Sequence, residues 1–167
     1  MIKLTGALCI VLSTTCIGFY RADILKKRTV YLKNIISSLC MLESEISFSQ
    51  NILRRVFIHI DGMSDTAGLF LKAAERTEGQ GIRDAWKSAV DDTAKEMCLK
   101  RNDIEVLYLF GENLGMSDRE SQIKNIRHTV DMMGPLLDEA EEDYKKNGRL
   151  CRGAGILSGL FFAVILY

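Results

Sequence analysis

The stretch LTGALCIVLSTTCIGFY, from Leu4 to Tyr20, contains no charged residue, and the interpretation of the remaining chain depends on it. A helix needs about 17 to 25 residues to cross a membrane, and this stretch meets the lower limit. A cleaved signal peptide would need small residues at a cleavage site after the apolar run, but the residues around Gly18 are bulky. We therefore predict an uncleaved transmembrane helix over residues 1–20.

A second charge-free stretch, GAGILSGLFFAVILY, covers residues 153–167. At 1.5 Å per residue a helix of this length reaches about 22 Å, against about 30 Å for the hydrocarbon core of a bilayer. The segment either spans by thinning the bilayer or lies partly inserted. Gly155 and Gly159 have the G-x-x-x-G spacing that lets another helix approach closely, although small residues are also common in membrane helices without specific pairing.

Basic residues flank both apolar stretches on their inner sides, at Arg21, Lys26, Lys27, Arg28, Lys145, Lys146, Arg149 and Arg152. Such clusters mark the cytoplasmic side of membrane segments. We therefore expect residues 21–152 to form a cytoplasmic domain, with residues 1–20 and 153–167 as membrane segments at its two ends. Export of this domain by a signal peptide would leave the second cluster on the wrong side.

The central region has the pattern of a helical bundle. Apolar residues recur at spacings of three, four and seven from Leu25 to Phe48, which predicts an amphipathic helix that continues from the first membrane segment. A shorter helix is expected to end near Asp61, and Ser64 is positioned to cap the next one. Gly79 and Gly81 then break the chain, and another helix begins at about residue 82.

Capping signals divide the second half of the bundle. Asn102 is expected to cap a helix that stops at Gly115, a favourable helix C-terminus. Ser117 and Glu120 have the S-x-x-E form of a capping box and predict the start of a helix that extends to about residue 147. Pro135 is expected to kink that helix.

Composition excludes several classes of function. Acidic and basic residues balance at 22 each, so there is no basic field for nucleic acid. The five cysteines form no C-x-x-C pair and are expected to be reduced, small buried hydrophobes. His59 and His128 lack metal-ligand spacing, and no phosphate-binding or nucleophile motif is present. We predict no enzymatic activity, no cofactor, no metal and no small-molecule substrate.

The segment LGMSDRESQ carries a resemblance to a known family. Leu114, Gly115, Ser117, Asp118 and Gln122 match the LG-x-SD-x-x-x-Q signature of the stage III sporulation AB proteins, which are distantly similar to the cytoplasmic F domains of type II secretion systems. Further matching positions, in order along the chain, are Gly6, Gly18, Arg28, Leu32, Leu42, Glu43, Glu45, Ile46, Trp86, Gly153 and Gly155.

This resemblance implies an all-α helical bundle like the F domain, anchored in the mother-cell membrane around the forespore. It further implies a non-enzymatic scaffold of a sporulation channel, which docks the secretion-type ATPase of the same operon, the AA protein, to other membrane components. The signature segment is then either a tight turn required for folding or a docking surface, with Glu43, Glu45 and Trp86 as further candidates. The alternatives are a general membrane-anchored adaptor unrelated to secretion and an enzyme with an unrecognised site.

Overall fold

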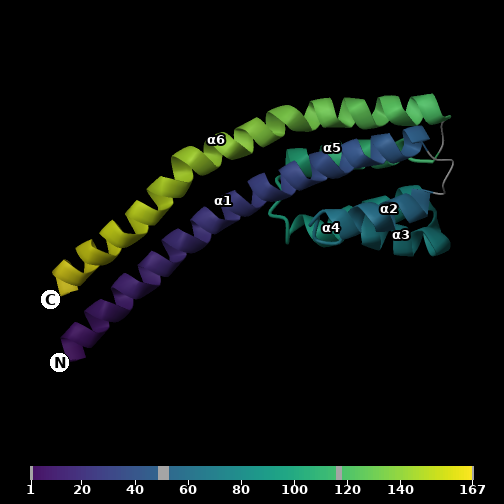
Figure 1. The fold of residues 1–167 in the computed structure, drawn as a ribbon. Helices are drawn as coiled ribbons and strands as arrows, with labels where there is room; N and C mark the ends of the chain where they lie inside the picture. Colours follow the sequence, from purple (N-terminus) through teal and green to yellow (C-terminus); the bar gives the residue numbers. More distant parts are fainter. Residues whose placement is uncertain (1, 49–52, 116–117, 167) are drawn as a thin grey trace. The chain divides into compact units, whose positions relative to one another are not determined.

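The protein is all-helical in the part of the chain that the computed structural model describes, residues 2–48, 53–115 and 118–166 (Figure 1). The prediction of an all-α fold is therefore confirmed. The helices are α1 (Ile2–Phe48), α2 (Leu53–Met63), α3 (Leu69–Gln80), α4 (Ile82–Ala94), α5 (Arg101–Glu112) and α6 (Arg119–Leu166).

The chain divides into two compact units. Unit 1 consists of residues 1–29 and 139–167, and unit 2 consists of residues 30–138. Unit 1 therefore pairs the first part of α1 with the last part of α6, and we call these two segments its arms. Unit 2 contains α2 to α5 together with the inner parts of α1 and α6.

Both long helices are continuous. The predicted continuation of the N-terminal apolar stretch into the amphipathic helix is confirmed, because α1 covers both. The predicted end of the last helix near Asn147 is wrong, because α6 runs through Asn147 and Gly148 to Leu166. Two contacts cover Gly148: the Tyr144 ring lies beside it, and Arg152 Nε donates to its carbonyl at 3.1 Å. Helix α6 also includes Pro135, where the kink stays a prediction.

The core of unit 2 centres on Trp86, which is fully buried. Its ring packs against the rings of Phe70 and Phe110 with centroids 5.3 and 5.0 Å away. Phe57 joins the cluster at 5.7 Å. The indole Nε1 donates to the Leu107 carbonyl at 2.7 Å, so the one polar atom of this side chain is satisfied inside the core. Helices α2, α3, α4 and α5 are thus joined by one aromatic cluster.

Two predicted helix caps are wrong. Ser64 does not begin α3, because its hydroxyl donates to the Asn34 carbonyl at 3.4 Å and α3 starts after Gly68, whose φ of 73° reverses the chain direction. Asn102 lies inside α5. The N-cap is Lys100, whose amide donates to the buried Asp103 carboxylate at 2.8 Å. That carboxylate fixes the helix start two residues before the predicted one.

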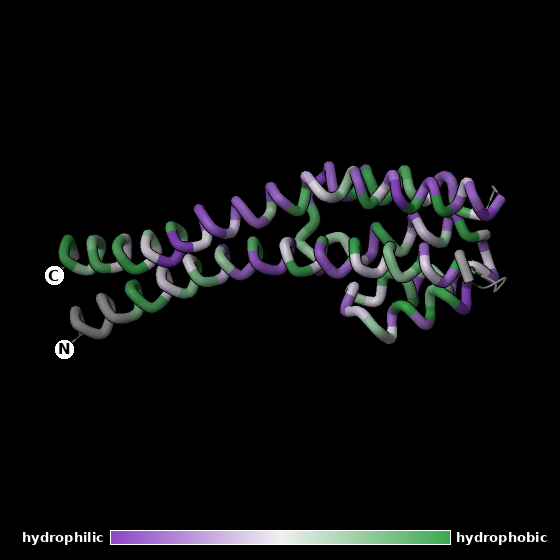
Figure 2. The backbone as a smooth tube through the Cα atoms, turned by 45° about the horizontal axis from the view of Figure 1, so that its top comes forward, coloured by the Kyte–Doolittle hydropathy of each residue, from purple (hydrophilic) through white to green (hydrophobic). Residues whose placement is uncertain are grey.

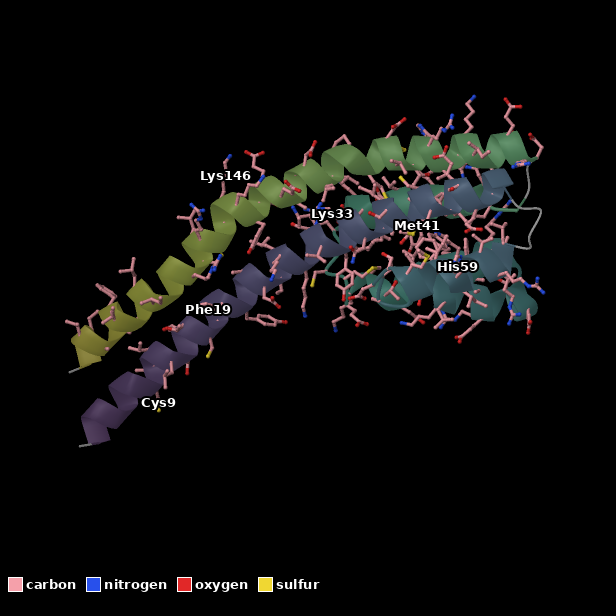
Figure 3. The ribbon with its side chains drawn as sticks, viewed as in Figure 1. Cys9, Phe19, Lys33, Met41, His59 and Lys146 are labelled. Carbon is pink, nitrogen blue, oxygen red and sulfur yellow. The ribbon has the colours of Figure 1, made fainter. Side chains whose placement is uncertain are left out.

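The cysteines are free in the described structure, but their predicted burial is wrong for three of them. Cys9, Cys16 and Cys40 are exposed, whereas Cys98 and Cys151 are half-buried. Cys9 lies on the first arm (Figure 3).

Replacing Gly111 by alanine tests the packing around Trp86. A Cβ at this position overlaps Trp86 Cδ1 and lies 3.2 Å from Cγ, so the indole must shift within a close-packed core. We expect G111A to lower the free energy of unfolding by about 1–3 kcal/mol. Circular-dichroism melts of the full chain in a neutral detergent measure this loss. The control is G79A in α3, where a Cβ meets nothing within 4 Å. Equal stability of the two variants would contradict this account.

Candidate functional site: a close-packed pair of apolar helices

The arms of unit 1 touch through backbone atoms at glycines. A Cβ on Gly18 would lie 2.5 Å from the Cys151 carbonyl oxygen, and one on Gly155 would lie 2.8 Å from the Thr14 carbonyl oxygen. At Gly159 a Cβ would lie 3.0 Å from Val11 Cα. No side chain fits at these three positions. The arms therefore run antiparallel in a register that glycine alone permits.

A buried cation joins the arms beyond the glycines. Arg28 is only 3% exposed, and its Nη1 lies 3.4 Å from Glu139 Oε1 and 3.9 Å from Asp143 Oδ2. Next to it, Thr29 Oγ1 donates to the Ala140 carbonyl at 3.1 Å. The guanidinium is buried, whereas the Glu139 and Asp143 side chains are partly exposed, so these contacts connect the packed interior of unit 1 with its surface.

The outer faces of the arms are apolar and exposed. Figure 2 shows apolar residues concentrated along the last part of α6. The exposed large side chains of the arms include Leu12, Ile17, Phe19, Tyr20, Ile156, Leu157, Leu160, Phe161, Phe162, Val164 and Ile165. Among the described helices, α6 alone is long and apolar enough, by length and composition, to cross a membrane.

The described residues of the signature segment lie at the end of α5 and at the start of α6. Gly115 has φ +74°, and a Cβ there would lie 2.8 Å from Ile82 Cγ2. Gln122 Nε2 donates to the Asn113 carbonyl at 2.9 Å, and Asn125 Nδ2 donates to the Phe110 carbonyl at 3.1 Å. The Phe110 carbonyl also accepts from the Asn113 amide at 3.4 Å, so the two side-chain amides of α6 add to the hydrogen bonds that close the end of α5. The turn explains why the signature needs a glycine and a glutamine at these positions.

Asp118 begins α6. Its carboxylate accepts hydrogen bonds from the Ser121 amide at 3.4 Å and from the Ser121 hydroxyl at 2.7 Å. These bonds hold the pKa of Asp118 below its ordinary value of 3.8. The capping role predicted for Ser117 falls on a residue outside the described part of the chain.

The other predicted docking residues have structural partners. Trp86, Leu114 and Gln122 are buried, so their side chains present no docking surface. Glu43 accepts from Arg127 Nε at 2.7 Å and thereby links α1 to α6 within unit 2. Glu45 lies 3.5 Å from Nδ1 of His59, which Figure 3 shows on α2. The two glutamates therefore point to different neighbours, as their spacing predicts.

An exposed polar recess lies between α4 and α5. It is lined by Arg83, Asp84, Lys87, Tyr108, Gly111, Glu112 and Asn113. The Tyr108 hydroxyl donates to Asp91, which raises the pKa of Tyr108, and the Lys87 ammonium lies 5.5 Å from the centre of the Tyr108 ring. These contacts hold charged side chains of α4 against an aromatic ring of α5.

Sequence reasoning missed Asn125 and gave Arg28 no structural role. The Asn125 amide donates to a carbonyl 15 residues earlier in the chain, so no local sequence pattern predicts this hydrogen bond. Arg28 belongs to a basic cluster whose other members are exposed, and its burial depends on Glu139, 111 residues away. Only the pairing of the arms makes that contact visible.

These features define a class: an all-helical protein in which two apolar segments, separated in the chain by a compact helical unit, pair closely. The family model for stage III sporulation protein AB matches residues 3–167, and the chain therefore belongs to that family. It is 29% identical over 170 residues to stage III sporulation protein AB of Bacillus subtilis (strain 168), covering 99% of both chains. A solved structure of a stage III sporulation protein AB shares the fold with a TM-score of 0.65 at 24% identity, covering 71% of this chain and 96% of that one.

Glycine contacts between the arms are tested by a matched pair of double variants. In G18A/G155A each new methyl meets backbone that cannot rotate away, so we expect an unfolding free energy lower by about 1–3 kcal/mol per site. In G6A/G153A the same two changes, again one on each arm, meet nothing within 4 Å. Unfolding of the full chain in mixed micelles of increasing denaturing-detergent content measures both. An equal decrease in the free energy of unfolding in the two double variants would contradict the close contact at Gly18 and Gly155.

The Asp118 cap predicts a dependence of stability on pH. A carboxylate whose pKa is lower in the folded state stabilises the protein above its unfolded pKa, and this contribution disappears as the pH falls through the folded value. We expect D118A to have a melting temperature several degrees below wild type at pH 7. The difference should narrow below about pH 4. D118N, which keeps a capping oxygen but does not titrate, is the control. A difference that does not change with pH would contradict the role of the ionised form.

Proposed function

We propose that this protein is a non-enzymatic, membrane-anchored scaffold of a sporulation channel complex in the mother-cell membrane around the forespore. In this proposal both arms insert into the bilayer and unit 2 faces the cytoplasm. The observation that carries it is the pair of arms, whose polar backbone contacts face inward while large apolar side chains face outward. Such a pair suits lipid, because close helix packing rather than hydrophobic burial joins helices there.

The charge distribution supports the proposed orientation. Arg21, Lys26 and Lys27 on the first arm, and Lys145 and Arg149 on the second, are exposed. Since the arms run antiparallel, the two basic clusters lie at the same end of unit 1. Both clusters then lie on the cytoplasmic side.

Unit 2 is the part of this scaffold that would dock the secretion-type ATPase of the same operon, as expected from the likeness to type II secretion F domains. Its aromatic cluster gives it a close-packed core, which supports the helices that would present a docking surface. The recess between α4 and α5 is our first candidate for that surface, because it gathers opposite charges around a tyrosine. A general adaptor would share the anchor but need no ATPase.

The test is capture of the purified ATPase by the full chain reconstituted in lipid nanodiscs, with and without nucleotide. We expect saturable binding that R83E/K87E weakens about tenfold or more, since reversed charges at an interface are repulsive. The control is K95E/K124E, which reverses the charge of two exposed lysines that do not line the recess. Equal weakening by both variants would reject the recess as the docking surface. No binding at tens of micromolar ATPase would reject the docking function and leave the adaptor.

A further inference from the structure

A second recess opens on unit 1, between the arms. Its volume is about 380 Å³, within the range of about 300–1,000 Å³ that is usual for small-molecule sites. Residues of both arms line it: Phe19, Tyr20, Ala22, Asp23 and Lys26 from α1, and Tyr144 and Arg152 from α6. It therefore combines three aromatic rings with two cations and one carboxylate.

The position of the recess along the arms is set by the glycine register. Gly18 lies against Cys151, so Tyr20 and Arg152 lie at about the same position along the axis of the paired arms. The charge-free stretch of α1 ends at Tyr20, and the charge-free stretch of α6 begins directly after Arg152. The recess thus lies where both arms change from apolar to charged. In a bilayer this is the level of the lipid headgroups, where tyrosine rings and basic residues gather.

The Arg152 side chain is directed toward that boundary. Its Nε donates to the carbonyl of Gly148, one turn back along α6 on the charged side. This is the snorkelling arrangement, in which an apolar stem lies along the helix and the charged group returns to the polar interface. One nitrogen is used by Gly148, and the planar guanidinium has further N–H groups that suit the oxygens of a phosphate.

The charges around the recess favour an anion. The carboxylate of Asp23 lies 3.7 Å from Lys27 Nζ, so its charge is offset by a lysine that does not line the recess. Lysines 145 and 146 also lie outside it and pair with Glu141 and Glu142 at 3.1 and 2.5 Å. Figure 3 shows Lys146 pointing away from α1. Two cations of the recess, from different arms, are therefore positioned to act on one ligand.

We propose that this recess binds the headgroup of an anionic phospholipid, with Lys26 and Arg152 on the phosphate and the aromatic rings beside the glycerol and upper acyl chains. The inference rests on the proposed insertion of the arms in a membrane. It adds a defined lipid site, contributed by both arms, to the general attraction between basic residues and an anionic bilayer. A bound lipid would join the arms at the level where the glycine contacts end.

The test is a titration of the full chain in neutral detergent micelles with phosphatidylglycerol or phosphatidylcholine, followed by native mass spectrometry. We expect one saturable phosphatidylglycerol adduct and at least several-fold weaker binding of phosphatidylcholine. K26Q/R152Q should weaken phosphatidylglycerol binding about tenfold or more, whereas K26R/R152K should retain most of it. The matched control, K145Q/K146Q, removes the same charge outside the recess and should bind as wild type.

Three outcomes would overturn the site: equal weakening by K26Q/R152Q and K145Q/K146Q, many adducts without saturation, or displacement of the lipid by millimolar inorganic phosphate. The last would show that the recess takes a free anion. Carbonate extraction of cell membranes separates this inference from the proposed function. Wild type and K26Q/R152Q should both stay in the membrane. Release of the wild type would reject membrane anchoring itself, whatever the lipid titration gives.

Discussion

The contact of Gly18 with the Cys151 carbonyl, repeated at Gly155 with Thr14, is the constraint on which unit 1 depends. It brings two backbones closer than any side chain allows and thereby fixes the register of the arms. That register places Arg28 beside Glu139 and Asp143 and brings the ends of both charge-free stretches to one level. In lipid, where apolar side chains gain nothing by leaving their surroundings, such contacts supply much of the specificity of helix pairing.

Unit 2 is stabilised by different interactions from those of unit 1. Its stability comes from the burial of large rings around Trp86 and from amides that satisfy helix ends, as Gln122 and Asn125 do for α5. The signature segment takes part in these hydrogen bonds through Gln122. A family signature can thus record what a turn requires for folding, and surface residues such as Lys87 and Tyr108 need no place in it.

The sequence patterns predict the fold well where the signal is local and periodic. The apolar spacing from Leu25 to Phe48 and the break at Gly81 agree with α1 and with the boundary of α3 and α4. Caps at Ser64 and Asn102 failed because a suitable residue type is common near any helix start, and Asn34 and Asp103 decide which residue is used. The end placed at Asn147 failed because Gly148 is contacted within α6 itself, by the Tyr144 ring and the Arg152 side chain one turn away on either side. In the candidate site, the G-x-x-x-G spacing of Gly155 and Gly159 indicates one packing face, and both glycines do contact the first arm. The spacing does not identify the partners of these glycines, because those partners are distant in sequence.

The separation of Thr29 from Ala140 by 111 residues has a consequence for biosynthesis. The first arm is synthesised before unit 2 and the second arm, so its glycine face has no partner from the same chain until residues 139–167 are made. Closing so large a loop in an unfolded chain is entropically costly and slow. Folding of unit 2 first, with Glu43 of α1 paired to Arg127 of α6, shortens the loop that remains to be closed. If unit 2 folds in this way before the arms pair, the glycine face of the first arm stays accessible to other helices until the second arm has been made.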